Sequence, residues 1–230
     1  MNQLITKYQI KLFPVLLSLA LLLVTFKIDL IHPSNTGLYV LKILSVPMLA
    51  IASLFFTFGK QGVLDVFSKP IKPFRNISIW YLISLVSSFI SALILKLVLH
   101  LPLQENPGSE HLVETLISLP FVLLFEEIIS IFILLVIANF IFKKTKNLVL
   151  SQTIGVILSS ICFGLLHYST YFNGSLVNTL IHILLVQGLV RIFLNLAALK
   201  SNSIIVPWII HVVFDFTSFG LSTVLLLSIL

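Results

Sequence analysis

Apolar residues in this chain gather into runs of about 20 or more, and short polar segments separate the runs. A helix needs about 20 apolar residues to cross the hydrocarbon core of a bilayer. The pattern therefore predicts about seven membrane-spanning helices, in a range of six to eight, because the last run is long enough to contain a break near Phe219-Gly220. The predicted spans are residues 10–31, 38–58, 77–101, 115–142, 148–167, 178–199 and 203–229.

The composition excludes a water-soluble protein. Of the 230 residues, 58% are hydrophobic and only 10% are charged, and the mean hydropathy is +1.14. So few polar side chains cannot cover a soluble core of this size, whereas lipid accepts apolar side chains directly. The longest polar connection, about residues 59–76, is too short to fold alone. We therefore expect an all-α fold, a polytopic transmembrane helical bundle that forms a single membrane-embedded domain over residues 1–230.

The basic residues predict an orientation in the membrane and no nucleic-acid partner. The formal net charge is +6, but the lysines and arginines stand in small groups between apolar runs and form no continuous stripe. Cytoplasmic loops tend to carry the positive excess, which places the following residues in the cytoplasm: Lys7, Lys11, Lys60, Lys69, Lys72, Arg75, Lys143, Lys144, Lys146 and Lys200. The opposite loops contain Asp29, Glu105, Glu110 and Glu114, with a turn at Pro107-Gly108. We expect a cytoplasmic amino terminus, and the bias to Ile, Lys, Asn and Phe is typical of a bacterial plasma-membrane protein.

A pair of adjacent acids, Glu126-Glu127, lies inside the predicted span 115–142. An ionised side chain at the bilayer centre costs about 2.5 to 3.5 kcal/mol, so the pair indicates a buried polar site. Neighbours on a helix diverge by about 100°, so one carboxylate is expected to face that site while the other needs its own partner. The alternative interpretation is a pair of structural carboxylates that brace neighbouring helices.

Two histidine patterns supply further polar groups in apolar surroundings. Phe163-x-x-x-His167 ends one run, and His211-x-x-x-Asp215 lies in the last run. A spacing of four residues places both members of a pair on one helical face, where a carboxylate can orient an imidazole. Alone, His167 is more often an interfacial residue than a catalyst, and His211 with Asp215 is equally a self-satisfied pair that joins two helices. His182, in the predicted span 178–199, receives little weight, because it is equally a hydrogen-bond donor between helices.

Taken together, these residues are the inventory for activating water to attack a carbonyl group. A carboxylate base, an imidazole, and a second imidazole with its own carboxylate suit hydrolysis. The same groups suit a divalent metal such as zinc, with ligands from Glu126, His167, His211 and Asp215, but their spacing matches no metal motif as specific as His-Glu-x-x-His. The sequence leaves the use of a metal open.

The order of these motifs resembles the CPBP family (Abi-like) of CAAX-processing and bacteriocin-processing intramembrane proteases. The resemblance covers about residues 115–217, and the family motifs are written Glu-Glu-x-x-x-Arg, Phe-x-x-x-His and His-x-x-x-Asn/Asp. The last two match fully. The first matches only in its glutamates, because Ile131 stands where the family has arginine. Arg191, in the predicted sixth span, is our hypothesis for the missing charge.

The resemblance implies a role for each motif residue. Glu126 would act as general base on the attacking water with the assistance of His167. His211 and Asp215 would hold the water or stabilise the oxyanion, and Glu127 would have a supporting role. Members of the family have been described both as metalloproteases and as glutamate-dependent proteases, so the resemblance also leaves the metal open.

Three functions are compatible with these observations. The first is an intramembrane endopeptidase acting on a small peptide precursor or a membrane-associated protein tail, in bacteriocin or pheromone maturation or in self-immunity. The second is a catalytically weakened membrane protein that binds a peptide and gives immunity, which Ile131 favours. The third, an ion-coupled transporter, is disfavoured because the sequence shows no inverted repeat. The positive-inside pattern would open a cavity at His167 outward, whereas CAAX processing is cytosolic, so the direction of the cavity stays open, as does the oligomeric state.

Overall fold

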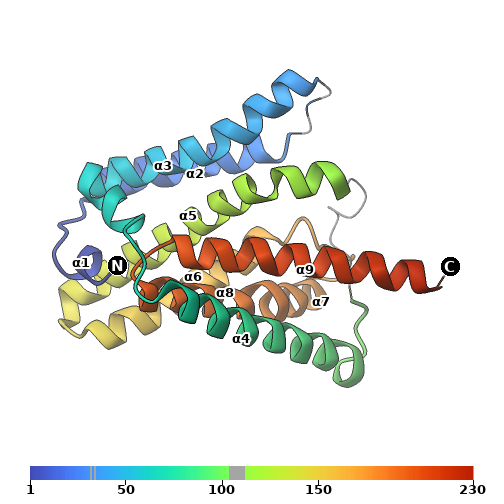
Figure 1. The fold of residues 1–230 in the computed structure, drawn as a ribbon. Helices are drawn as coiled ribbons and strands as arrows, with labels where there is room; N and C mark the ends of the chain where they lie inside the picture. Colours follow the sequence, from blue (N-terminus) through green and yellow to red (C-terminus); the bar gives the residue numbers. More distant parts are fainter. Residues whose placement is uncertain (32, 34, 104–111, 230) are drawn as a thin grey trace.

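The computed structural model describes residues 1–31, 33, 35–103 and 112–229, and the side chains of all of these except residues 112 and 221–229. Within these residues every regular element is helical (Figure 1). The elements are α1 (Asn2–Thr6), α2 (Leu12–Asp29), α3 (Thr36–Val66), α4 (Pro73–Leu93), the π-helical turn η1 (Ile94–Val98), α5 (Leu112–Thr145), α6 (Leu148–Leu166), α7 (Leu176–Ile183), the π-helical turn η3 (Leu184–Gly188), α8 (Leu189–Ser201) and α9 (Ile205–Ile229). The predicted turn at Pro107-Gly108 lies outside the described residues, as do Glu105 and Glu110.

Six of the seven predicted membrane spans are confirmed, which lies within the predicted range of six to eight. Six helical segments are long and apolar enough to cross a bilayer: 12–29, 36–66, 73–98, 113–145, 148–166 and 176–201. The apolar part of α9 over Ile205–Gly220 corresponds to the seventh prediction, and the helix continues past Gly220 without a break. Large apolar side chains such as Phe13 and Val149 are exposed on the outer faces, where lipid would solvate them. The chain is an integral membrane protein with an all-α fold.

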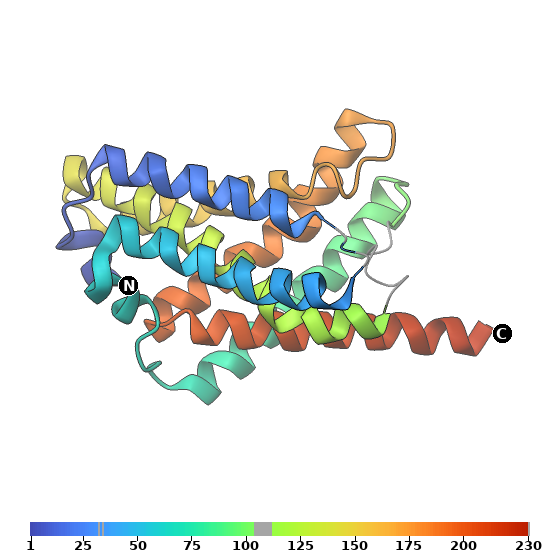
Figure 2. The same cartoon turned by 90° about the horizontal axis from the view of Figure 1, so that it is seen from above.

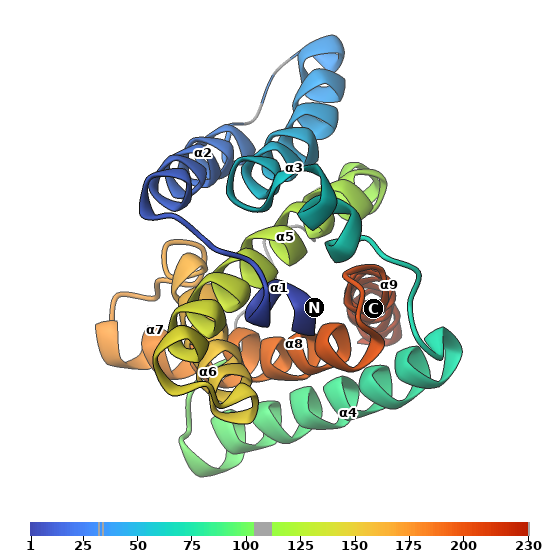
Figure 3. The ribbon, with the colours of Figure 1, turned by 90° about the vertical axis from the view of Figure 1, so that its left-hand side faces the viewer.

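Helix α5 is the central helix of the bundle. It packs against α6, α3 and α9, and it is the most buried of the spanning helices. The α2–α3 hairpin lies on one side of it and α4 on the other (Figures 1 and 3), and in the view from above the hairpin lies over α5 (Figure 2). The backbones of α5 and α6 approach closely at Gly155, where a Cβ atom would lie 3.0 Å from the carbonyl oxygen of Leu134. Such small residues let membrane helices pack backbone to backbone.

Helix α3 is longer than the predicted span 38–58 because a kink lets it continue. Gly59 has φ 69° and ψ −179°, a backbone conformation that glycine adopts readily and that other residues rarely adopt. The chain then resumes helical conformation as far as Val66. Residues 59–66, which the sequence assigned to a polar loop, are therefore largely helical.

One end of the bundle, called here the basic end, is formed by residues 1–11, 60–75, 143–147 and 200–205. A short helix that sequence reasoning missed, α1, packs there with the buried residues Leu4 and Ile5 (Figure 3). Asn139 of α5 donates to the carbonyl oxygens of Ile5 and Tyr8, each at 2.9 Å. The amino-terminal ammonium group donates to Oδ1 of Asn202 at 2.5 Å. The amino terminus is thus part of the packed structure.

The opposite end, called here the distal end, is formed by residues 27–31, 33, 35–42, 96–103, 114–118 and 167–175 together with the carboxyl-terminal half of α9. Lys42 forms an ion pair with Asp29 across the α2–α3 connection, at 3.5 Å between Nζ and Oδ1. The Tyr39 hydroxyl donates to the carbonyl oxygen of Glu114 at 3.1 Å. These contacts join α2, α3 and α5 at the distal end.

Candidate active site

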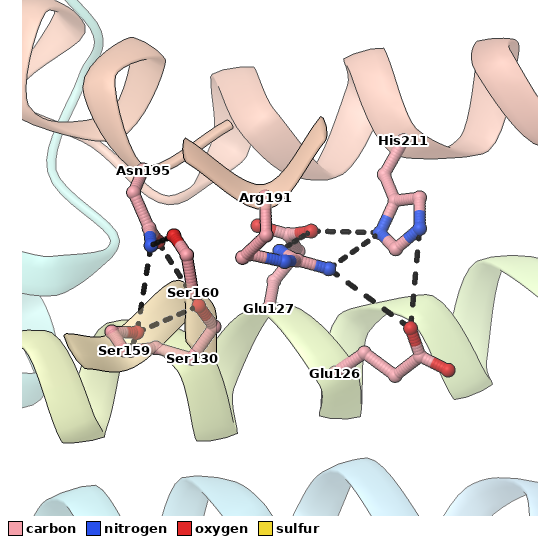
Figure 4. A network of polar contacts seen from close by, with 8 residues as sticks. All are labelled: Glu126, Glu127, Ser130, Ser159, Ser160, Arg191, Asn195 and His211. Atoms are coloured by element: carbon pink, nitrogen blue, oxygen red, sulfur yellow. Dashed lines mark hydrogen bonds and ion pairs between the residues drawn. The ribbon is translucent and has the colours of Figure 1, made fainter. Parts of the chain in front are cut away.

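The two adjacent glutamates of α5 point in different directions, as their helical spacing requires. Glu126 lies on the wall of an internal cavity, and 23% of its side chain is exposed. The side chain of Glu127 is only 1% exposed and turns toward α8. One carboxylate therefore faces the cavity, and the other is enclosed by protein. Figure 4 shows that the two side chains point in different directions.

Arg191 of α8 supplies the positive charge beside both glutamates. Its Nη1 donates to Oε1 of Glu127 at 2.5 Å, and its Nη2 lies 4.0 Å from Oε2 of Glu126. The guanidinium carbon lies 3.7 Å from the centre of the Phe163 ring, a cation–π arrangement. Ile131 is fully buried in the apolar core. The predicted contact between Arg191 and the glutamates is thus confirmed. The positive charge comes from α8 and not from α5.

His211 of α9 completes this cluster. Its Nδ1 lies 2.8 Å from Oε1 of Glu127 and 3.3 Å from Nη2 of Arg191. An ionised carboxylate only accepts, and a guanidinium only donates, so Nδ1 is best assigned as a donor to Glu127. Nε2 of His211 is then directed toward Glu126, at 3.9 Å from its Oε2. That separation is too long for a direct hydrogen bond but suits a bridging water.

His167 follows the last residue of α6, at the mouth side of the same cavity. Its Nδ1 lies 3.0 Å from the carbonyl oxygen of Phe163, which can only accept a hydrogen bond. The neutral ring therefore carries its proton on Nδ1 and leaves Nε2 as an acceptor. The Phe163 ring packs on the imidazole with 4.8 Å between ring centres. Phe163 thus supports both His167 and Arg191, which gives the Phe-x-x-x-His spacing a physical reason.

A cavity of about 690 Å³ brings the predicted residues together. Glu126, His167, His211 and Asp215 all line it, and Asp215 lies one helical turn beyond His211 on α9. Glu127 lies behind this wall and contacts the cluster through Arg191 and His211. Apolar side chains of α2, α4, α5 and α9 form much of the remaining wall.

Sequence reasoning missed part of the polar wall, namely Tyr171 and Gln187, and gave His182 little weight. His182 and Arg191 both line the cavity, although nine residues of a regular α-helix turn by about two and a half turns and place the two ends on opposite faces. The π-turn η3 lies between them, and a π-turn takes up one residue more than an α-turn. The extra residue brings His182 to the cavity side. No pattern in the sequence signals the π-turn.

Two properties of this wall bear on ligand binding. His182 is 4% exposed, and its Nδ1 has no hydrogen-bond partner among the described residues. The ring of Tyr171 packs on it at 5.2 Å between centres. Burial, together with the negative charges of Asp215 and Glu126, raises the pKa of the Tyr171 hydroxyl. Tyr171 therefore stays protonated at neutral pH and is able to donate a hydrogen bond.

A buried hydrogen-bond network lies next to the charged cluster, toward the basic end (Figure 4). Ser130 donates to Oδ1 of Asn195 at 3.0 Å, and Asn195 donates to the Ser160 hydroxyl at 3.2 Å. Ser159 donates to the carbonyl oxygen of Ser130 at 2.7 Å. Asn195 lies one turn after Arg191 on α8, so the network fixes α8 against α5 and α6 and thereby positions the guanidinium group.

We expect Asn195→Ala to lower the stability of the protein by about 1 to 2 kcal/mol, because interhelical hydrogen bonds are lost and serine hydroxyls are left unpaired. The measurement is the temperature at which detergent-solubilised protein leaves its monodisperse size-exclusion peak. Asn178→Ala on α7, outside the network, is the matched control. Equal effects of the two substitutions would contradict this role for Asn195.

The same residues include the types of side chain that bind divalent metals. Among the described residues, no three His, Cys, Asp or Glu side chains stand in an arrangement that could hold a metal ion. One nitrogen of His211 is engaged with Glu127, and the guanidinium group of Arg191 already places a cation beside both carboxylates. In this arrangement the side chains do not form the zinc set suggested by the sequence.

The fold and the site define a class: integral membrane proteins with an all-helical fold and a buried cavity lined by carboxylates and imidazoles. Within this class, residues 108–217, just under half of the chain, match the model of the family described as type II CAAX prenyl endopeptidase Rce1-like. The resemblance to the CPBP family that the motifs indicated is thereby confirmed for this segment, and the matched family is one of proteases. Comparisons with curated proteins and with solved structures gave no match.

Proposed function

We propose that this protein is an intramembrane endopeptidase that hydrolyses a peptide bond with a water molecule activated by Glu126. The observation that carries the proposal is the asymmetry of the glutamate pair. Glu127 is enclosed between Arg191 and His211, whereas the Glu126 side chain is partly exposed to the cavity. A carboxylate with access to substrate and water is what a general base requires.

The proposed reaction uses the 3.9 Å interval between Glu126 Oε2 and His211 Nε2. A water held there would transfer one proton to Glu126 while its oxygen forms a bond to the scissile carbonyl carbon. The carbonyl electron pair moves onto oxygen, and the resulting oxyanion collapses with cleavage of the C–N bond. Glu126 returns its proton to the leaving amine, so the products are a carboxylate and an amine after proton loss to water.

The remaining polar residues would support this chemistry. His167 presents an unprotonated Nε2 on the cavity wall and would assist Glu126 in holding the water. His211 and Asp215 would hold the water or the oxyanion, as the family resemblance implies. Arg191 would act as a positioning residue, because it keeps Glu127 ionised and thereby fixes the Nδ1 proton of His211.

For the substrate we propose a small peptide precursor or the tail of a membrane-associated protein. A cavity lined by apolar side chains and by a cluster of polar groups suits an extended peptide with apolar side chains. The resemblance suggests bacteriocin or pheromone maturation, or self-immunity, as the biological role. The alternative, a binding protein with weakened catalysis, has Ile131 in its favour, but the presence of Arg191 beside the glutamates removes its main support.

We expect purified wild-type protein to cleave a synthetic precursor peptide at the same rate with and without a zinc chelator, and His167→Ala to lower that rate by about 10² or more. Product is quantified by mass spectrometry, and Cys162→Ala, which alters α6 away from the site residues, is the matched control. Loss of cleavage on chelation, restored by zinc, would replace the glutamate mechanism by a metal mechanism. Equal rates for wild type and His167→Ala would remove His167 from the mechanism.

A further inference from the structure

The distribution of charge and the shape of the cavity together identify the side from which substrate arrives. We infer that the cavity opens to the extracytoplasmic face of the membrane, and that the substrate is therefore an exported peptide or the extracytoplasmic flank of a membrane protein. The identity of the substrate rests on the proposed function, whereas the orientation of the cavity in the membrane does not.

Ten of the fourteen lysines and arginines lie at the basic end, and contacts show that these segments meet there. The backbone N–H of Ile71 donates to the carbonyl oxygen of Ser201 at 2.8 Å, and Lys143 donates to the carbonyl oxygen of Ile10 at 3.1 Å. The ten residues are Lys7, Lys11, Lys60, Lys69, Lys72, Arg75, Lys143, Lys144, Lys146 and Lys200. Their only acidic neighbour within the described part of the chain is Asp65.

The distal end has the opposite character. Its basic residues are Lys27, Lys42 and Lys96, and Lys42 is already paired with Asp29. Positive charge in short loops determines orientation, with the excess retained in the cytoplasm. Ten basic residues against three therefore place the basic end in the cytoplasm and the distal end outside.

The cavity reaches the distal end only. Its wall includes Asp29 and Leu30 at the end of α2, Thr170 in the loop after α6, and Ser218 on the distal half of α9. Thr170 is exposed. Among the described residues, none of those that form the basic end, as defined above, belongs to this wall.

Packing closes the cavity on the basic side. The Ser130–Asn195 network lies one turn beyond the glutamates in that direction. Beyond the network, the core continues through Ala138 and Ala198 to Leu4 of α1, each fully buried. A peptide from the cytoplasm would have to displace this core, whereas a peptide from the distal side meets an opening.

Cysteine labelling tests the inference directly, because Cys162 is the only native cysteine. In a Cys162→Ala background, Thr145→Cys at the end of α5 and Thr170→Cys in the loop after α6 place the same change on opposite sides of α6, and both threonines are exposed. We expect a membrane-impermeant maleimide to label Thr170→Cys in intact spheroplasts and to label Thr145→Cys only after the membrane is permeabilised, with at least a tenfold difference in each case. Labelling of Thr145→Cys in intact spheroplasts, alone or together with Thr170→Cys, would overturn the inference.

This readout is independent of catalysis. Labelling in the predicted pattern by a protein that cleaves no peptide would keep the orientation and refute the proposed function. Cleavage by a protein with the reversed pattern would keep the function and show that its substrate comes from the cytoplasm. Glu126→Gln in the same background should leave the labelling pattern unchanged, because the substitution alters neither the basic loops nor the mouth of the cavity.

Discussion

Glu126→Gln should abolish peptide cleavage while the protein still folds and accumulates. Glutamine keeps the shape of the side chain but cannot take a proton from water, so we expect the rate to fall by about 10² to 10⁴. The substitution should be tolerated structurally because Glu126 faces the cavity and lies 4.0 Å from its nearest cation. The measurement is the initial cleavage rate at matched protein concentration.

Glu127→Gln is the matched control for that substitution. It makes the same chemical change one residue away, but at a side chain that is fully enclosed and paired at 2.5 Å with Arg191. We expect it to lower stability, whereas Glu126→Gln lowers the rate at unchanged stability. If Glu126→Gln kept the wild-type rate, or if both substitutions acted only on stability, Glu126 would not be the base.

Arg191→Ala should destabilise the protein more than any other single change at the site. The guanidinium group is 1% exposed and contacts Glu127, His211 and the Phe163 ring. Its removal leaves the Glu127 carboxylate buried without its cation, which typically costs about 3 to 5 kcal/mol. The measurement is the fraction of detergent-solubilised protein that stays monodisperse after heating.

A double substitution separates the loss of charge from the loss of volume. Arg191→Met combined with Glu127→Gln removes both charges and keeps most of the buried volume, so it should recover much of the stability that Arg191→Ala loses. It should not recover cleavage, because His211 then has no ionised partner for Nδ1. Wild-type stability of Arg191→Ala would contradict the proposed pairing.

The fold was predictable because lipid imposes a simple requirement on the chain. Each spanning segment must satisfy its backbone internally and expose apolar side chains, so hydropathy alone gave spans such as 148–167, which agrees with α6 to within one residue. The site residues stood out for the same reason, since Glu126 and His211 are conspicuous within apolar runs. Their assembly around one cavity follows because such groups are tolerated in a membrane only when they meet partners or water.

Other features depend on tertiary contacts that the sequence pattern does not contain. The kink at Gly59 and the π-turn η3 change helix length and phase without altering hydropathy, so the positions of His182 and Gln187 in the cavity were not foreseen. Helix α1 is too short to form without the core that covers Leu4 and Ile5. Charge alone suggested that Arg191 pairs with a glutamate of α5. It could not show which of the two glutamates forms the close pair, because that depends on how α5 is rotated toward α8.

The central claim, that this protein cuts peptide bonds with Glu126 as the base, is tested most directly without knowledge of the substrate. Membranes from cells that express wild-type or Glu126→Gln protein at equal levels are compared by mass spectrometry of newly formed peptide amino termini. We predict a set of termini that is present with wild type and absent with Glu126→Gln. Identical sets of termini in the two membranes would contradict the account.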